Sequence, residues 1–157
     1  CLYNSLLYIN RNNAETKRYQ EEGLKLLSGK VDSLPSKIAF RPKFIKQSSC
    51  IKVFDKLYLF ISKANIKKPL EERFDALFHE IGHWLHFQNI PPLKECREIW
   101  KTANLEKIKE DVSEYAVKKD DGREFVAEVF KGLIKGKKYD EYIMNLYKRL
   151  HGPVPYD

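Results

Sequence analysis

Apolar residues recur at intervals of three and four residues in the middle of the chain. They are Phe74, Leu77, Phe78, Ile81 and Leu85. This period is typical of one face of an α-helix. Pro69 lies just ahead of the run, where proline is tolerated, and Pro91-Pro92 follows it, where proline ends a helix. The pattern predicts a helix with an apolar face between these prolines.

The segment before this helix changes from helical to β-type patterning. Residues 14–28 read as a polar helix, and Pro42 suggests that its segment is an edge or an exit of a sheet. Asp55-Lys56 would form a tight turn between two strands. Three short β-prone runs are expected to form the strands, and they are residues 38–41, 51–54 and 57–61.

The segment after Pro92 is helical again. Leu105, Ile108, Val112 and Tyr115 form one helical stripe, Asp120-Asp121-Gly122 reads as a turn, and residues 123–134 and 139–150 read as the last two helices. No linker or repeat interrupts residues 1–157. The sequence therefore predicts one α+β domain with the order helix, small sheet, helices.

Composition excludes some classes of protein. A hydrophobic content of 43% is globular, and no apolar run approaches the ~18 residues that span a bilayer, so we expect no membrane partner. The first ten residues lack the basic start and cleavage site of a signal peptide. Because the chain starts at Cys1 without Met, we expect an excised or processed part of a longer protein.

The net charge and the cysteines indicate which binding partners and which cellular compartment to expect. The net charge is +7, but the lysines are scattered among acidic residues, which favours a solvated surface over a nucleic-acid interface. Cys1, Cys50 and Cys96 are odd in number and lack C-x-x-C spacing, so they predict neither a disulfide framework nor a thiolate zinc site. A reducing compartment is expected, with an exported toxin or phage domain as the alternative.

The stretch His79-Glu80-Ile81-Gly82-His83 lies within the central predicted helix. Two histidines four residues apart project from one face of a helix, where their imidazoles can bind one zinc ion. Glu80 is rotated by about 100° from His79, so it reaches a water at the metal and does not act as a ligand in that plane. The motif predicts a zinc site with Glu80 as the base. Gly82 costs about 1 kcal/mol in a helix interior, which indicates a close packing contact.

A catalytic zinc site needs a third protein ligand. Asn89 stands where a third histidine of one common pattern would lie, and we place His86 at the surface or behind the ligands and His151 at the surface. Glu124 and Glu128 lie on one face of an otherwise apolar predicted helix, where a buried carboxylate needs a countercharge. The pattern alone favours the metal for Glu124 and solvent for Glu128.

The combination of HEIGHW, Ser-Glu-Tyr-Ala (113–116) and EFVAE (124–128) resembles the lethal-factor-type zinc metalloproteases, which are gluzincins, and related zincin domains of phage minor head and mobile-element proteins. The resemblance covers about residues 50–131. It implies a zincin-like fold, with His79, His83 and Glu124 as zinc ligands. It also implies that Glu128 holds one of the two histidines from behind.

The resemblance further implies two features of catalysis. Tyr115 would match the tyrosine that hydrogen-bonds the reacting carbonyl; its alternative is a core residue of the stripe at 105–112. Strand 57–61 would be the edge strand along which an extended peptide substrate pairs. Glu80 would take a proton from the attacking water, whose pKa zinc lowers, and deliver it to the leaving amine.

The sequence thus predicts a zinc-dependent endopeptidase, and three alternatives remain. One is a repressor-cleaving regulatory metalloprotease, which also has H-E-x-x-H and a later Glu. Another is a zincin-fold domain with a structural or interaction role in a phage or toxin protein. The third is a basic nucleic-acid-binding module with structural zinc, whose affinity for DNA would fall steeply with salt. The sequence does not predict the substrate sequence or the oligomeric state.

Overall fold

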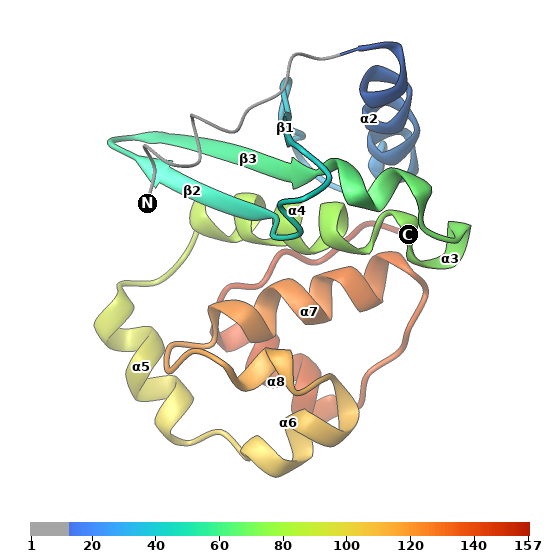
Figure 1. Ribbon diagram of the computed structural model, residues 1–157. Coiled ribbons are helices and arrows are strands. Elements are labelled where there is room, and N and C mark those ends of the chain that lie inside the picture. Colours follow the sequence, from blue (N-terminus) through green and yellow to red (C-terminus); the bar gives the residue numbers. More distant parts are fainter. Residues whose placement is uncertain (1–12) are drawn as a thin grey trace.

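A three-stranded mixed sheet covers one side of a group of helices, and the N-terminal helix lies beside one end of the sheet (Figure 1). The computed structural model describes residues 13–157. In chain order the elements are α2 (Ala14–Leu27), β1 (Ala39–Arg41), β2 (Ser49–Val53), β3 (Lys56–Ser62), η1 (Lys63–Lys67), α3 (Leu70–Arg73), α4 (Asp75–Phe87), α5 (Leu93–Lys101), α6 (Leu105–Asp111), η2 (Tyr115–Val117), α7 (Arg123–Ile134) and α8 (Glu141–Arg149). The predicted α+β class is confirmed. The expectations for the first ten residues, Cys1 included, lie outside the described residues.

The sheet order is β1-β3-β2, so β3 is the central strand. Ala39 of β1 pairs with Phe60 in the parallel direction, and Cys50 of β2 pairs with Leu59 in the antiparallel direction. The prediction that strand 57–61 is the edge strand is therefore wrong. The reason is that the end of β3 is buried on both faces, while β2 is shorter, more polar and only half-buried, as suits an edge.

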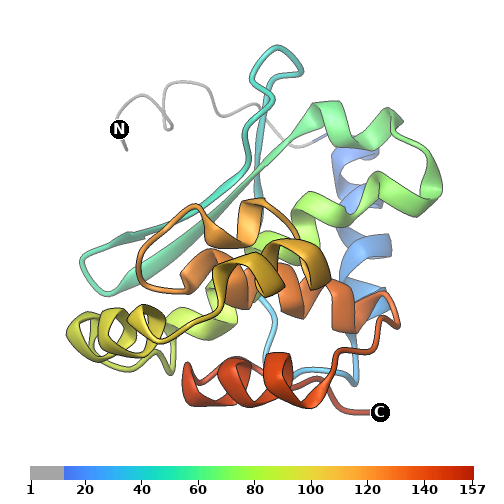
Figure 2. The same cartoon turned by 90° about the horizontal axis from the view of Figure 1, so that it is seen from below.

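The turn between β2 and β3 lies one residue earlier than predicted. Phe54 and Asp55 form it, and Phe54 takes a left-handed backbone conformation with φ of 55°. The predicted strand 51–54 thus ends at Val53. The side chain of Phe54 is 94% exposed at the tip of this hairpin, which lies toward the same end of the molecule as α5 (Figure 2). Pro42 follows the last residue of β1, as predicted for an exit from the sheet.

Helix α2 is capped at its N-terminus, and one face of it packs against other parts of the protein. Asn13 and Thr16 form a reciprocal capping box, with both bonds at 2.9 Å. Tyr19 stacks on Phe74, with ring centroids 4.9 Å apart, and its hydroxyl donates to the carbonyl of Arg73 at 2.8 Å. These contacts fix α2 against the junction of α3 and α4.

Helix α4 lies between the sheet and α7, and it contacts β2, β3 and α7 (Figure 1). It is buried on several faces, so its polar residues are largely out of water. The predicted helix is interrupted once, at Phe74, where φ of −103° and ψ of 7° separate the short α3 from α4. Helix α4 ends at Phe87, before Pro91-Pro92 as predicted, and Pro92 also directly precedes α5, a helix that was not predicted.

Gly82 lets α4 and α7 approach closely. A Cβ atom at this position would lie 3.1 Å from the Cα of Ala127 and 3.1 Å from Cδ1 of Phe130. The space next to the α4 backbone is thus taken by α7. The packing contact that the sequence predicted for Gly82 is confirmed.

The predicted helical stripe from Leu105 to Tyr115 ends early. Helix α6 stops at Asp111, and Tyr115 begins the short η2. The helix predicted over 123–134 is confirmed, and the one predicted over 139–150 is present as α8. None of the helices in residues 13–157 is long and apolar enough to cross a membrane.

His86 lies in the core, and its placement at the surface or behind the ligands was wrong. Its side chain is fully buried, and Nε2 lies 2.7 Å from the carbonyl oxygen of Leu150. Since a carbonyl only accepts, Nε2 carries the proton, and Nδ1 has no hydrogen-bond partner among the described residues. Burial lowers the pKa of His86 to about 4, because a second proton would sit on this buried Nδ1.

We expect His86 to weaken the fold in acid. The unfolded chain takes up a proton near pH 6.5, while the folded chain does not until about pH 4, so stability falls as the pH is lowered through this window. The loss from this residue is about 2 kcal/mol between pH 7 and pH 5. Urea unfolding of the wild type and of His86→Gln at both pH values measures it. Parallel pH profiles of the two proteins would contradict the assignment.

Candidate metal centre

Helices α4 and α7 bring together the three residues predicted as ligands. Nε2 of His79 lies 3.0 Å from Oε2 of Glu124, and Nε2 of His83 lies 3.1 Å from the other carboxylate oxygen, Oε1. One ligand-type atom from each of the three residues lies within 4.8 Å of the others. The arrangement could hold a metal ion.

Local structure explains why these atoms converge. His79 and His83 are one helical turn apart, and their ring centroids are 4.8 Å apart. Helix α7 begins after Gly122, whose φ of 76° gives a sharp entry, and the side chain of Asp121 accepts from the backbone N–H of Arg123. Glu124 therefore lies in the first turn of α7, directly opposite the two histidines.

The spacing suits zinc. Zinc bonds of about 2.0–2.1 Å in tetrahedral geometry place neighbouring ligand atoms about 3.4 Å apart. The contacts of Glu124 with His79 and His83 are slightly shorter than this, at 3.0 and 3.1 Å, and all ligand-type atoms of the group lie within 4.8 Å of one another, so small shifts of the side chains would admit an ion. Two imidazoles and one carboxylate are also the donor set of many catalytic zinc sites.

Glu128 supports His79 from the far side of its ring. Its Oε2 lies 2.9 Å from Nδ1 of His79, while its Oε1 accepts from the hydroxyl of Ser113 at 2.9 Å. The ammonium of Lys131 also lies 2.9 Å from Oε2. Glu128 is therefore buried with its charge compensated, which corrects the solvent position that the pattern alone favoured. A bond at Nδ1 orients the ring and leaves Nε2 to face a metal.

The charges in this cluster stabilise one another. Burial favours the neutral form of His79, but its bonds to Glu124 and Glu128 outweigh that effect and raise the pKa of His79 to about 9. Burial opposes ionisation of the two carboxylates, and the histidine contacts again outweigh it. The pKa of Glu128 falls to about 2, and that of Glu124 falls well below its usual range.

Glu80 lies beside the same histidines but keeps a raised pKa and, within residues 13–157, one oxygen without a hydrogen-bond partner. Its side chain is 6% exposed, and among the described residues its Oε2 has no hydrogen-bond partner. Burial raises the pKa of Glu80, although His83 and His79 nearby oppose the rise. An orphaned buried carboxylate next to a ligand cluster is suited to exchange a proton with a group in the cleft.

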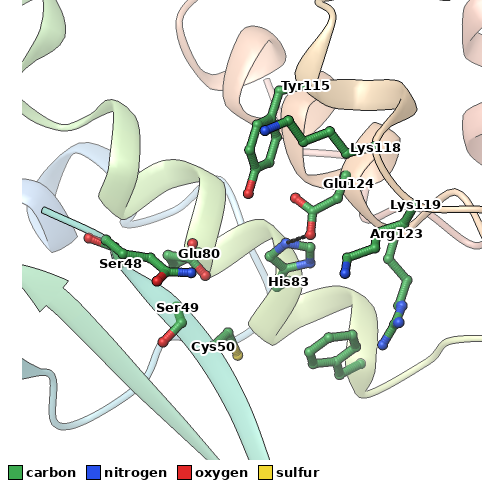
Figure 3. A pocket seen from close by; sticks show the side chains of 12 residues that line it. Ser48, Ser49, Cys50, Glu80, His83, Tyr115, Lys118, Lys119, Arg123 and Glu124 are labelled. Atoms are coloured by element: carbon green, nitrogen blue, oxygen red, sulfur yellow. Dashed lines mark ion pairs between the residues drawn. The ribbon is translucent and has the colours of Figure 1, made fainter. Parts of the chain in front are cut away.

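An open cleft of about 500 Å³ reaches this cluster (Figure 3). One wall is the start of β2, with Ser48, Ser49 and Cys50, and the floor includes Glu80, His83 and Glu124. The other wall is the segment from η2 to α7. The strand that borders the cleft is β2, one of the two edge strands of the sheet among the described residues, and not residues 57–61, to which the sequence analysis assigned this position.

Tyr115 lies in this cleft and not in the core. It is 43% exposed, and its ring meets that of His79 edge to face at a centroid distance of 5.4 Å. Its hydroxyl end points into the pocket (Figure 3). The alternative reading of Tyr115 as a core residue of the 105–112 stripe is therefore excluded.

Several residues of the site were not anticipated. Lys131 and Ser113 support Glu128, and the spacing of Lys131, three residues after Glu128 on one helix, was the available signal. Lys118 and Lys119 follow the motif tyrosine and line the cleft. His151 is exposed, as predicted.

Comparisons with known protein families, with characterised proteins and with solved structures produced no match. The interpretation of the site therefore rests on its own residues.

We expect zinc to bind this cluster and to stabilise the fold. Binding to the folded chain alone adds about 2.7 kcal/mol to the free energy of unfolding when zinc exceeds its dissociation constant 100-fold. His79→Ala and Glu124→Ala should lose both the bound ion and the stabilisation, whereas His151→Asn, a histidine outside the cluster, should keep them. Metal content after dialysis and thermal unfolding with and without a chelator give the answer. Full zinc retention by both cluster variants would refute the site.

Glu128 should tune the affinity for the ion without binding it. Loss of a partner behind a ligating histidine costs about 10–100-fold in metal affinity. We therefore expect Glu128→Gln to bind zinc more weakly by this factor but still with one ion per chain. Competition titration with a coloured chelator measures the constant. Unchanged affinity would show that the His79–Glu128 bond does not orient the ligand.

Proposed function

We propose that the chain is a zinc-dependent peptide hydrolase of zincin-like fold. The observation that carries this proposal is the convergence of His79, His83 and Glu124 beside Glu80, a buried carboxylate with an unpartnered oxygen, at the floor of an open cleft. A structural zinc site is closed by its protein ligands, whereas a catalytic site keeps an open position. Two of the three proposed ligands, His83 and Glu124, line the cleft, which suits the second case.

Zinc bound here would supply a Lewis acid that acidifies water and polarises a carbonyl group. In this proposal two side chains of the protein, those of Glu80 and Tyr115, act directly in the reaction. Glu80 takes the proton of the attacking water and returns it to the leaving amine, as its raised pKa suits. The Tyr115 hydroxyl, directed into the pocket, donates to the oxygen on which negative charge develops.

Strand β2 suits the role of a platform for an extended substrate. Its inner edge pairs with β3, and no strand among residues 13–157 pairs with its outer edge. Its first residues, Ser49 and Cys50, line the cleft. A peptide added along this edge would be held by backbone bonds and would place a peptide group over Glu80.

Replacement of Glu80 by Gln tests the proposal. The amide keeps the size of the side chain but cannot accept the proton, so we expect hydrolysis of a peptide library to fall by at least about 100-fold. Zinc content should stay at the wild-type value, because Glu80 is not in the ligand group. Mass spectrometry of the library digest, run with and without a chelator, reports cleavage.

Two results would point elsewhere. Zinc binding without chelator-sensitive cleavage in the wild type favours the non-proteolytic zincin-fold domain. Cleavage that persists undiminished in Glu80→Gln refutes Glu80 as the base.

A further inference from the structure

The two walls of the cleft differ in charge. The β2 wall contributes Gln47, Ser48, Ser49 and Cys50, which carry no charge in their ordinary forms. The opposite wall contributes three cations, which are Lys118, Lys119 and Arg123 (Figure 3). The exposed positive charge of the cleft lining is therefore on one side, while on the β2 side Arg41 is buried behind the wall and donates to Gln47 and Ser49.

The lysines of this wall are not neutralised by neighbours. Arg123 forms an ion pair with Asp121 at 2.9 Å, so its charge is compensated. The ammonium of Lys118 lies 4.9 Å from the ring centroid of Tyr115, and Lys119 has no ion pair within residues 13–157. Both lysines are exposed. Their charges are thus available to a ligand.

The positive surface continues out of the cleft. Lys118 and Lys119 also line a neighbouring groove together with Lys94, Arg97 and Lys101 of α5. Two acidic residues lie there, Glu98 and Asp120, and the latter is 3.9 Å from Arg97. Cations therefore outnumber acids along a path that begins at the ligand cluster. We call these five residues, Lys94, Arg97, Lys101, Lys118 and Lys119, the basic path.

The carboxylates on the cleft floor do not cancel the positive charge of the basic path once a zinc ion is bound. The cleft has two of them, Glu80 and Glu124, and a zinc ion brings two positive charges of its own. The remaining field in the cleft is that of the basic path. Charge of one sign along a groove attracts ligands of the opposite sign and selects among them.

We propose that the basic path selects peptide substrates with acidic side chains on one side of the scissile bond. This inference rests on the proposed function and names its substrate class. A peptide fits better than a nucleic acid, because bases need exposed aromatic faces on which to stack. Trp100 of the neighbouring groove is 6% exposed, and in the cleft Phe87 stacks on His83 while the ammonium of Lys118 lies over one face of Tyr115.

A charge-reversal experiment tests the proposal. Lys101→Glu with Lys119→Glu reverses two charges of the basic path and leaves Lys118 on Tyr115. Lys17→Glu with Lys25→Glu makes the same change in net charge on the exposed side of α2. The substrates are peptides cleaved by the wild type, each paired with a copy in which Asp and Glu are replaced by Asn and Gln.

The readouts separate selection from catalysis. We expect the ratio of kcat/KM for acidic over neutral peptides to fall about ten-fold in the basic-path variant, since two exposed charge contacts turn repulsive, and to stay unchanged in the α2 variant. The dissociation constant of the acidic peptide from zinc-loaded Glu80→Gln should rise by a similar factor when the basic-path substitutions are added. The preference for acidic residues should be confined to substrate positions on one side of the cleaved bond.

The outcomes can be told apart. Cleavage by the wild type without preference for acidic peptides, or an equal effect of both double variants, overturns the inference and leaves the proposed function intact. Absence of any cleavage overturns the proposed function. Tighter binding of a DNA oligonucleotide than of acidic peptides, lost in the basic-path variant, assigns the path to nucleic acid and overturns the inference.

Discussion

The mutual compensation of buried charges at the α4–α7 contact is the constraint on which the structure depends. His79 and His83 on α4 face Glu124 and Glu128 on α7 at distances of 2.9 to 3.1 Å. Each of these groups would be costly to bury alone. The two helices can therefore pack only in the register that pairs them. The register that allows these charges to be buried also brings together the ligand-type atoms of His79, His83 and Glu124.

Much of the fold follows from periodicity. Helices α2, α4 and α7 have repeating apolar positions, and their limits were predicted to within a few residues. Helix α5 was missed although its apolar residues, Leu93, Cys96 and Trp100, recur at helical spacing, because Pro91-Pro92 was taken only as the end of the preceding helix and not as the start of another. The position of β3 in the sheet was also missed. Strand order depends on contacts between distant residues, which local patterning does not contain.

Some residues of the site could likewise be predicted from local patterning, and others could not. His79, Glu80 and His83 were predictable, because their spacing alone places them on one helical turn. Glu124 was favoured by the conflict between a carboxylate and an apolar helix. The pattern alone left Glu128 in solvent, because two of its three partners, His79 and Ser113, come from other parts of the chain. His86 looked like a neighbour of the site, yet its ring bonds to Leu150, and a single sequence offers no sign of that contact.

The turn at Gly122 lies between the exposed loop of residues 118–120 and Glu124 in the first turn of α7. A side chain there would collide with Leu150 and Trp100, so the entry into α7 is held by the body of the protein. Residues 118–120 precede this anchor and are exposed. Insertions or exchanges in that loop would change what the cleft admits while the position of Glu124 stays the same. Under the proposed function, one architecture would in this way supply a series of related enzymes that share their chemistry and differ in the sequences they cut.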